Sequence, residues 1–459
     1  MTSETAPPLQ GLVAGNVSDR PPSETSGTVQ THDQAIPNHT LEALDEVHNG
    51  IVQEEAPTWT AFIPNHTLQT IIDEHTSPQF HALAWLRSHP DYQSMPSWRK
   101  QQLLALGSFY FSTGGDRTWA FSARRGWLNG LVHECDWEGD QAFDPNCTDG
   151  RYQDLDLEYD TLVGTLNEEL YLLSALTSLR LPWNALTGPV PKSIWQLKLS
   201  TLWLRSNQLS TSIPADLEHL SAMKELCLDT NLVTGTIPTE LGNLSMMKVL
   251  SSIDTVLSGT LPTELGRMTE LTKLHLWSNE LSGTIPTQYG RLRHVNSFEI
   301  WENDLTGSLP SEIFEMPLTR IFRFNNNQLS GTLPSELGKW VSLGRFMAEE
   351  NSFSGTIPSE VGNMIALTSL SLDGNDLRGT LPTQLSQLRA LQELWLNDNQ
   401  LTGTIPTWFS RLLGLQQLNL NGNMLTGTVP TGVCELPHLK SLTVDCWRVS
   451  CNCTPCFCS

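Results

Sequence analysis

Side chains suited to molecular recognition recur in this chain at a spacing of 24 residues. Trp277 and Trp301 form one such pair, and His275, Glu299 and Arg323 form a second series. Indole faces stack on sugar rings or on flat peptide groups, while Arg, His and carboxylate groups orient a ligand through hydrogen bonds. The chemistry that these residue types offer is binding.

Motifs for catalysis are missing from the sequence. It contains no G-x-S-x-G, no H-E-x-x-H, no Walker loop and no kinase motif set. Glu349 and Glu350 are adjacent carboxylates, but neighbouring residues on a strand point to opposite sides, so a solvated rim explains them better. We therefore expect no enzyme activity, no cofactor and no metal requirement.

Nine cysteines add a second kind of chemistry, because they can form disulfides or bind a soft metal. Cys227 stands alone, on a strand position that we expect to face outward. The disulfide candidates are Cys135, Cys147, Cys434, Cys446, Cys451, Cys453, Cys456 and Cys458. We assign no connectivity to the C-terminal six. Their terminal C-x-C-x-x-C-x-C, with His438 nearby, could instead hold zinc, but an oxidising compartment favours disulfides.

An asparagine that returns every 24 residues, with one step of 23, sets the register of these groups. It stands at Asn184, Asn207, Asn231, Asn279, Asn303, Asn327, Asn351, Asn375, Asn399 and Asn423. Thr255 fills one gap, and Asp160 takes the place one period before Asn184. Around each asparagine the pattern reads L-x-x-L-x-L-x-x-N-x-L-x-G-x-[IL]-P. This period and leucine spacing predict a leucine-rich repeat solenoid.

The elements of one repeat follow from its residues. The L-x-L alternation predicts a short half-buried strand, and stacked repeats pair these strands into one parallel sheet. The asparagine amide is suited to bond backbone groups where the chain turns, and Gly and Pro shape the segment that follows. No repeat can bury its leucines alone, so each stabilises its neighbours. The repeat with Thr255 has lost its asparagine and a core apolar residue, which we interpret as a tolerated lapse.

The form L-x-G-x-[IL]-P-x-x-L-G, as in Leu281 to Gly290, resembles the plant-type leucine-rich repeat. That family includes receptor-kinase ectodomains, receptor-like proteins and polygalacturonase inhibitors. Residues 104–139 resemble its N-terminal cap, where the family carries a disulfide at the places of Cys135 and Cys147. Residues 76–86 and the cysteine-dense tail are similar to algal receptor-like proteins. The resemblance implies an α/β repeat solenoid: a right-handed superhelix with a curved parallel sheet on its concave face, a helical N-terminal cap and a Cys-rich C-terminal cap.

We expect four segments. Residues 1–75 form an acidic, largely disordered tail, 76–152 the helical cap, 153–445 about eleven to twelve repeats, and 446–459 the C-terminal cap. The tail carries eleven acidic residues against Arg20 alone, within a net charge of −22. A strongly acidic chain without a basic cluster argues against a nucleic-acid partner.

The tail contains a short duplication. Ile36-Pro37-Asn38-His39-Thr40-Leu41 recurs as residues 63–68. It could be a duplicated docking motif, but short motifs are weak evidence, and we favour a local duplication without function.

Binding should use the concave sheet, whose outward strand positions lie four and two residues before each asparagine. Aromatic, Arg and His residues gather in the middle of that series. We predict a ligand-binding face of Trp203, Arg205, His275, Trp277, Glu299, Trp301, Arg323 and Glu349. Adjacent strands are about 4.8 Å apart, so Trp277 and Trp301 should stand side by side. Alternatively, the tryptophans simply cover each other and the neighbouring leucines.

The sequence also indicates where the protein works. N-glycosylation candidates are Asn16, Asn38, Asn65, Asn146, Asn243 and Asn452. No signal peptide and no apolar run long enough to span a membrane is visible. The sequons and cap cysteines favour an extracellular or cell-surface location, with a cytoplasmic one left open.

The function that we expect is non-enzymatic recognition of a peptide, protein or glycan ligand, as in receptor-like proteins, with a membrane-bound co-receptor as a candidate partner. The alternatives are a secreted inhibitor of a cell-wall-degrading hydrolase and a structural or adhesive extracellular protein. The sequence identifies neither the ligand nor the oligomeric state, because leucine-rich scaffolds carry unrelated binding surfaces.

Overall fold

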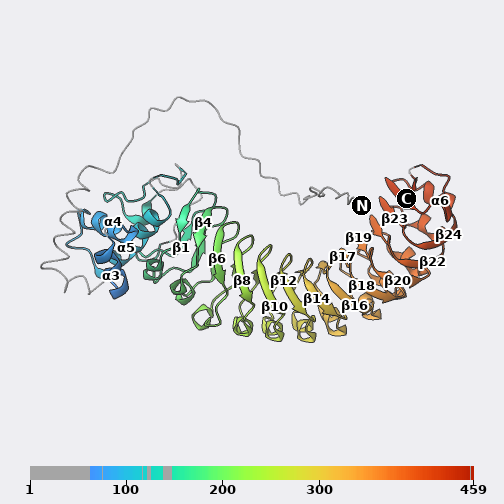
Figure 1. The fold of residues 1–459 in the computed structure, drawn as a ribbon, viewed down its shortest axis with the longest axis horizontal. Helices are drawn as coiled ribbons and strands as arrows, with labels where there is room; N and C mark the ends of the chain where they lie inside the picture. The colour runs from blue at the N-terminus through green and yellow to red at the C-terminus, as the bar shows by residue number, and fades with distance from the viewer. Residues whose placement is uncertain are drawn as a thin grey trace, which may run out of the picture.

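The repeats stack into a curved solenoid with helices at its N-terminal end. The computed structural model describes residues 63–74, 76–115, 117–120, 126–137, 147–454 and 456–458. Figure 1 shows the strands following one another along an arc, with α3 (Asn65–Asp73), α4 (Pro78–Arg87) and α5 (Ser97–Ser112) at one end and α6 (Thr431–Cys434) at the other. The predicted solenoid architecture is confirmed.

A parallel sheet of 14 strands lines the inner side of the arc, and each strand pairs with the strand of the next repeat. Its strands are β1 (Asp154–Asp156), β3 (Ser178–Arg180), β5 (Thr201–Trp203), β7 (Glu225–Cys227), β9 (Val249–Ser251), β11 (Lys273–His275), β13 (Ser297–Glu299), β15 (Ile321–Arg323), β17 (Arg345–Met347), β19 (Ser369–Ser371), β21 (Glu393–Trp395), β23 (Gln417–Asn419), β25 (Ser441–Val444) and β27 (Cys456–Cys458).

The central residue of each strand builds the core. Leu370, Leu394, Leu418 and Leu442 lie in register, and each is at most 1% exposed. Burying one such leucine contributes about 1.5–3 kcal/mol. The identical register from repeat to repeat therefore produces one continuous apolar column along the solenoid.

A second parallel sheet, of 13 strands, was not predicted. It is made by the L-x-G segment that follows each asparagine. Gly403 in this sheet has φ +89°, and an added Cβ would lie 3.0 Å from Thr380 Cγ2, so glycine is needed there. Its strands are β2 (Val163–Thr165), β4 (Ala185–Gly188), β6 (Gln208–Ser212), β8 (Leu232–Thr236), β10 (Val256–Thr260), β12 (Glu280–Gly283), β14 (Asp304–Gly307), β16 (Gln328–Thr332), β18 (Ser352–Gly355), β20 (Asp376–Gly379), β22 (Gln400–Thr404), β24 (Met424–Thr428) and β26 (Val449–Ser450).

Short 3₁₀ helices after the proline cover the outer side of the arc. In most of them the proline stands at the N-cap, where its fixed φ and missing N–H are tolerated. They are η2 (Glu168–Leu172), η3 (Lys192–Gln196), η4 (Glu218–Leu220), η5 (Thr239–Asn243), η6 (Thr263–Arg267), η7 (Thr287–Arg291), η8 (Ser311–Glu315), η9 (Ser335–Lys339), η10 (Ser359–Asn363), η11 (Thr383–Gln387) and η12 (Thr407–Arg411).

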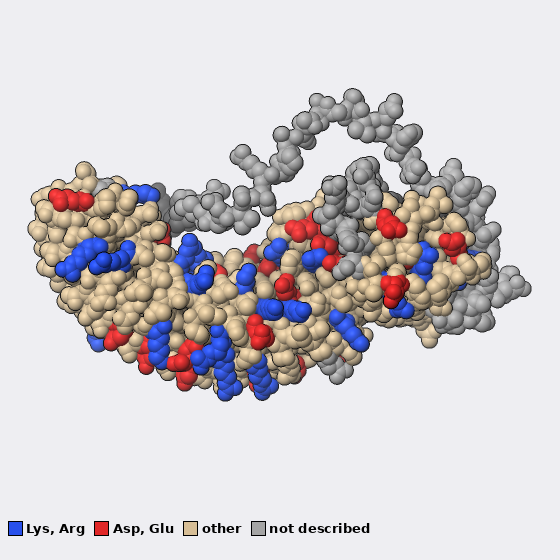
Figure 2. Space-filling model, turned by 180° about the vertical axis from the view of Figure 1, so that it is seen from behind, with Lys and Arg blue, Asp and Glu red and all other residues tan. Residues whose placement is uncertain are grey.

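Charged side chains of both signs alternate along this outer edge in the view of Figure 2. Lys339 and Arg293 both lie near Glu315, at 2.5 and 3.9 Å. All three side chains are well exposed, so these pairs contribute little to stability. The outer edge therefore presents mixed charge in this view.

The repeated asparagine bonds the backbone as expected. Asn399 Nδ2 donates to the carbonyls of Leu372, Leu396 and Asn397 at 2.9, 3.3 and 3.1 Å. Its Oδ1 accepts from the N–H of Leu377 at 2.9 Å. One side chain thus joins its own turn to the preceding repeat.

In the repeat with Thr255, hydroxyl groups stand where other repeats have the asparagine amide and a core apolar side chain. Ser252 is fully buried, and its hydroxyl lies 3.2 Å from that of Thr255. Thr255 Oγ1 in turn donates to Asn279 Oδ1 at 2.5 Å. The lapse is tolerated because both polar groups have partners.

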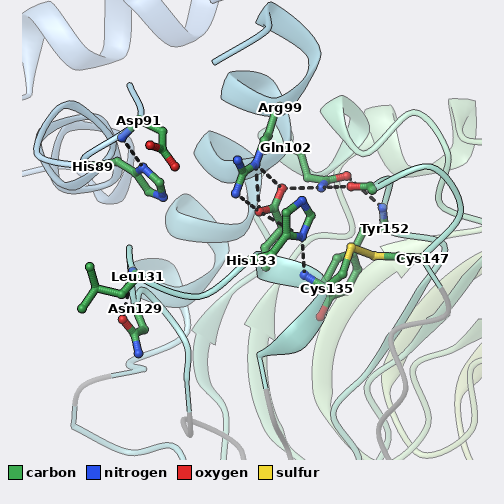
Figure 3. A network of polar contacts seen from close by, with 12 residues as sticks. His89, Asp91, Arg99, Gln102, Asn129, Leu131, His133, Cys135, Cys147 and Tyr152 are labelled. Atoms are coloured by element: carbon green, nitrogen blue, oxygen red, sulfur yellow. Dashed lines mark hydrogen bonds and ion pairs between the residues drawn. A yellow bond between two sulfur atoms is a disulfide. The ribbon is translucent and has the colours of Figure 1, made fainter. Parts of the chain in front are cut away.

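The N-terminal cap is held by a buried polar network (Figure 3). Glu134, in η1 (Glu134–Asp136), is fully buried and accepts from Arg99 Nη2 at 2.9 Å and from Gln102 Nε2 at 2.8 Å. Gln102 Oε1 accepts from the N–H of Tyr152 at 2.8 Å, and Cys135 is disulfide-bonded to Cys147. The network links α5 to η1 and to the segment just before β1, and the disulfide that the resemblance implied is present.

Helix α3 corrects our boundary for the disordered tail. We expected disorder up to residue 75, yet Ile63 and Ile71 are 2% and 0% exposed. Composition averages over the whole segment, whereas Ile63 just before α3 and Ile71 within it both join the core. The rest of the tail lies outside the described residues.

The six C-terminal cysteines form disulfides. The pairs are Cys434–Cys453, Cys446–Cys458 and Cys451–Cys456. Within the described ranges, no group of three His, Cys, Asp or Glu side chains is arranged to hold a metal ion. Strand β27, which carries Cys456 and Cys458, pairs with β25 and covers the last repeat.

Two further sequence expectations concern the surface. Asn65, Asn243 and Asn452 are exposed, whereas Asn16, Asn38 and Asn146 lie outside the described residues. Among the helices that the structure describes, none has the length and apolar character needed to cross a bilayer.

Candidate functional site

Five of the predicted residues come together at the centre of the inner sheet, and we call them the central group: His275, Trp277, Glu299, Trp301 and Arg323. His275, Glu299 and Arg323 end adjacent strands and lie in register. Trp277 and Trp301 follow two residues beyond His275 and Glu299, and their rings stack with centroids 4.3 Å apart and an interplanar angle of 12°. The prediction that the two indoles stand side by side is confirmed.

Glu299 is the polar centre of this group. Its carboxylate accepts from Ser297 Oγ at 2.8 Å and lies 3.5 Å from Arg323 Nη1 and 3.6 Å from His275 Nε2. Ser297 Oγ also lies 3.0 Å from His275 Nε2. These contacts hold three side chains of three repeats in one arrangement beside the indole stack.

Burial lowers the pKa of His275, although the neighbouring Glu299 and Asp229 carboxylates oppose that shift. At pH 7 the imidazole is therefore mainly neutral, and Arg323 is the cation that balances Glu299. The group presents a hydrogen-bonding imidazole rather than a second positive charge.

Several polar atoms of the predicted face have no partner. Trp301 Nε1, Arg323 Nε and Glu349 Oε2 are buried and make no hydrogen bond. Burial, with Asp373 nearby, raises the pKa of Glu349 to about 7, against the opposing effects of Ser371 and Arg323. Buried polar groups are normally satisfied by protein or water, so these three atoms are exceptions within the predicted face.

The core beneath the central group is aromatic. Phe298 and Phe322, the inward residues of β13 and β15, are fully buried and stack with centroids 4.9 Å apart. Large side chains in a close-packed core restrict movement of the strands above them. The central group therefore stands on a rigid base, which reduces the entropy lost on binding.

Trp203 and Arg205 belong to a separate cluster, which we call the N-terminal group with Tyr159 and Trp183. The Arg205 guanidinium lies 4.0 Å from the Trp183 ring centroid and 5.4 Å from that of Trp203. Tyr159 stacks on Trp183 at 4.5 Å. The sequence analysis placed Trp203 and Arg205 in one cluster with the central residues, and the structure divides them.

Trp183 and Tyr159 were missed because they are not at outward strand positions. Each directly precedes the repeated asparagine position and has a left-handed backbone, with φ of +53° and +60°. The available signal was an aromatic residue at the place where the other repeats have Ser, Thr, Asp, Glu, Asn or Gly.

Cys227 lies between the two groups, and its predicted outward exposure is wrong. It aligns with Trp203 and Ser251 in the sheet, yet it is only 7% exposed, and burial raises its thiol pKa to about 12. In the sheet it stands between the large Trp203 side chain and the small Ser251 side chain. The thiol is neutral, unpaired and unreactive at physiological pH.

Comparisons with known proteins agree with this geometry. The family model described as "Leucine rich repeat" matches residues 365–425 and 389–445, and a model described as "Leucine Rich Repeat" matches residues 198–220. No curated protein matches the chain.

Solved receptor structures are similar to the chain. The plant peptide hormone receptor RGFR1 in complex with RGF2 is 33% identical over 64% of this chain and 52% of its own, with a TM-score of 0.60. The structure of PEPR1 with AtPEP1 is 32% identical to this chain. The match covers 65% of this chain and 42% of the PEPR1 chain, with a TM-score of 0.62.

A third similar structure is the Arabidopsis receptor kinase HAESA in complex with the peptide hormone IDA and the co-receptor SERK1. It is 31% identical over 70% of this chain and 58% of its own, with a TM-score of 0.57. The chain thus matches about half the length of these receptor chains.

Proposed function

Because the chain is a leucine-rich repeat protein of the plant type, we propose that it binds a peptide ligand through the central group. The observation that carries the proposal is the Trp277–Trp301 stack beside a carboxylate held between His275 and Arg323. The similar receptor structures include complexes with peptide hormones, which supports a peptide over a glycan.

Each part of the central group has a role in this proposal. The stacked indoles offer a flat apolar surface for a peptide plane or an apolar side chain, and Trp is among the residues most enriched at binding hot spots. Glu299 and Arg323 orient the peptide through hydrogen bonds, while Trp301 Nε1 and Arg323 Nε supply free donors. Glu349 extends the site by one repeat.

The proposal implies an extracellular protein that acts without catalysis and shares its ligand with a partner protein. Four disulfides and exposed sequons suit an oxidising compartment. HAESA was solved with a co-receptor, which makes a co-receptor the partner class to test here.

The test uses an array of synthetic dodecapeptides, probed with wild-type protein and with the Trp277→Ala/Trp301→Ala variant. For peptides that bind the wild type, calorimetry should give a dissociation constant at least about 100-fold larger for the variant, because hot-spot tryptophans contribute roughly 2 kcal/mol each or more.

Trp395→Ala is the matched control. Trp395 holds the outward position that ends β21, and no aromatic ring of the described residues stacks on it. Unchanged affinity in the double variant, or an equal loss in the control, would contradict the assignment of the central group.

A further inference from the structure

Helix α3 occupies a defined site, which we call the α3 site, formed by α4 and η2 at the N-terminal end of the solenoid. Ile63, Thr67 and Ile71 are spaced four residues apart and are 2%, 0% and 0% exposed. Thr67 and Ile71 are one turn apart on the same side of the helix, and Ile63 packs into the core just before the helix begins. The contact surface of α3 is therefore short and well defined.

The α3 site contains a buried carboxylate that recognises a hydroxyl. Glu169 is 1% exposed, and its Oε1 accepts from Thr67 Oγ1 at 2.8 Å. Its Oε2 accepts from Gln79 Nε2 at 2.9 Å and from Asn167 Nδ2 at 3.0 Å. Loss of the hydroxyl would leave a buried carboxylate oxygen without that donor, which is costly. The site therefore selects a threonine or serine at this position.

The remaining residues of the hexapeptide at 63–68 also make contacts. The His66 ring lies 6.1 Å from that of Tyr171, Leu68 packs against the cap core, and Pro64 stands at the N-cap of α3. Asn65 and His66 are the exposed members. The six residues thus behave as a recognition motif for the α3 site.

The first copy of the hexapeptide, residues 36–41, has the same residues at the positions that make these contacts in the second copy. Ile36, Thr40 and Leu41 correspond to Ile63, Thr67 and Leu68, and Leu44 stands where Ile71 would be. Two of the differences, Glu42 for Gln69 and Glu46 for Asp73, fall on exposed positions of α3. The described buried positions of the second copy thus carry the same residue or another apolar residue in the first copy.

We propose that the α3 site is a motif-binding site, which takes residues 36–46 of the same chain in place of residues 63–73. The first copy lies outside the residues that the structure describes. Two copies then compete for one site, and the copy that is not bound is available for other contacts. The first copy carries the apolar and hydroxyl residues that the second copy uses to contact the site.

The linkers set the balance between the copies. Residues 74–77 join α3 to α4, whereas residues 47–77 would join the first copy to α4. The entropy of closing the longer loop favours the second copy by about 20-fold. The second copy should therefore hold the site most of the time, as the structure has it.

Hydrogen exchange of full-length variants tests the proposal. I63S/I71S weakens the second copy, I36S/L44S weakens the first, and a fourfold variant weakens both. Residues 78–87 and 167–173, which surround the site, report its occupancy. We expect I36S/L44S to change nothing in the wild-type background, but to lower protection at least about tenfold in the I63S/I71S background.

Two results would overturn the proposal. If I36S/L44S has no effect in either background, the first copy does not use the site. If I63S/I71S keeps its protection but light scattering shows a dimer, the occupant comes from a second chain. A variant without both sequons, N38Q/N65Q, should exchange like the wild type, and an effect equal to that of the fourfold variant would assign the duplication to glycosylation instead.

Discussion

The residue before each repeated asparagine has a left-handed backbone. Trp183, Ser278, Glu302 and Asp398 have φ between +53° and +56°, and Gly374 takes the same place in its repeat. This conformation costs a non-glycine residue roughly 1 kcal/mol. The asparagine offsets that cost, because the turn brings its amide within reach of three carbonyls.

Asp160 shows what happens when a carboxylate takes the asparagine position. It is 7% exposed, and its Oδ2 has no hydrogen-bond partner. An ionised carboxylate has no proton to donate to the carbonyls that the amide contacts elsewhere. Burial, with Asp156 and Glu158 nearby, raises its pKa to about 6. The neutral form is therefore the one that suits the fold.

This predicts a pH-dependent effect of Asp160→Asn. Because the folded pKa is raised above the ordinary 3.8, the native state binds the proton more tightly, and its stability falls as pH rises from about 4 to 6. The variant should be about 1–2 kcal/mol more stable than wild type at pH 7, with the gain shrinking towards pH 4. Urea melts at both pH values measure the difference, and an equal gain at both would contradict the titration of Asp160.

The repeat with Thr255 offers a second test. Ser252→Leu with Thr255→Asn would restore the buried leucine and the backbone-bonding amide that other repeats have. We expect the pair to raise the free energy of unfolding by about 1–3 kcal/mol. Thermal melting measures this, with Thr255→Asn alone as the partial control. A destabilised double variant would show that the hydroxyl pair is better accommodated than a leucine.

At the scale of elements, polar contacts join three segments of the cap. Arg99 and Gln102 on α5 both bind Glu134, and Gln102 also reaches the carbonyl of Gly150 at 2.9 Å. Glu134 is fully buried and Arg99 is 16% exposed. A buried pair of this kind is destabilising mainly when one partner is removed.

Glu134→Ala should therefore destabilise the cap by about 3 kcal/mol, because Arg99 is left without its carboxylate. Hydrogen exchange should show the loss in α4 and α5 first. The matched control is Glu315→Ala on the outer edge, which removes exposed ion pairs and should leave exchange unchanged. Equal effects of the two changes would mean that the buried network has no special role.

At the scale of the whole molecule, a solenoid is stabilised by contacts between neighbours, so its ends depend on their caps. The last repeats have neighbours on one side only, and three disulfides cross-link the segment that covers them. The central repeats have neighbours on both sides and an aromatic core.

Reduction should therefore open the molecule from its C-terminal end. After treatment with a thiol reductant, amide exchange should accelerate most in β23 to β27 and least around β13 and β15, because loss of a disulfide in a small unit typically costs roughly 2–4 kcal/mol. Mass spectrometry after exchange resolves the segments. If amide exchange accelerates equally along the whole chain, the stability of a repeat does not depend on its neighbours.

Sequence patterns predicted the site in part. Period and alternation predicted that Trp277 and Trp301 would be adjacent, because one repeat advances one strand and neighbouring strands lie side by side. The same reasoning missed Trp183, since its direction depends on a left-handed backbone that the alternation rule does not include. It also misjudged Cys227, which is buried at a strand position where the alternation rule expects exposure.

By itself the sequence determined the repeat, the inner sheet and the asparagine bonds, because each depends on local periodicity that is the same in every copy. Only the tertiary structure decided the pairing of the C-terminal cysteines, the docking of α3 onto Glu169, the second sheet and the division of the tryptophans into two groups. Those features depend on contacts between residues whose distance in space is set by the curvature and packing of the stack, and no periodic pattern encodes them.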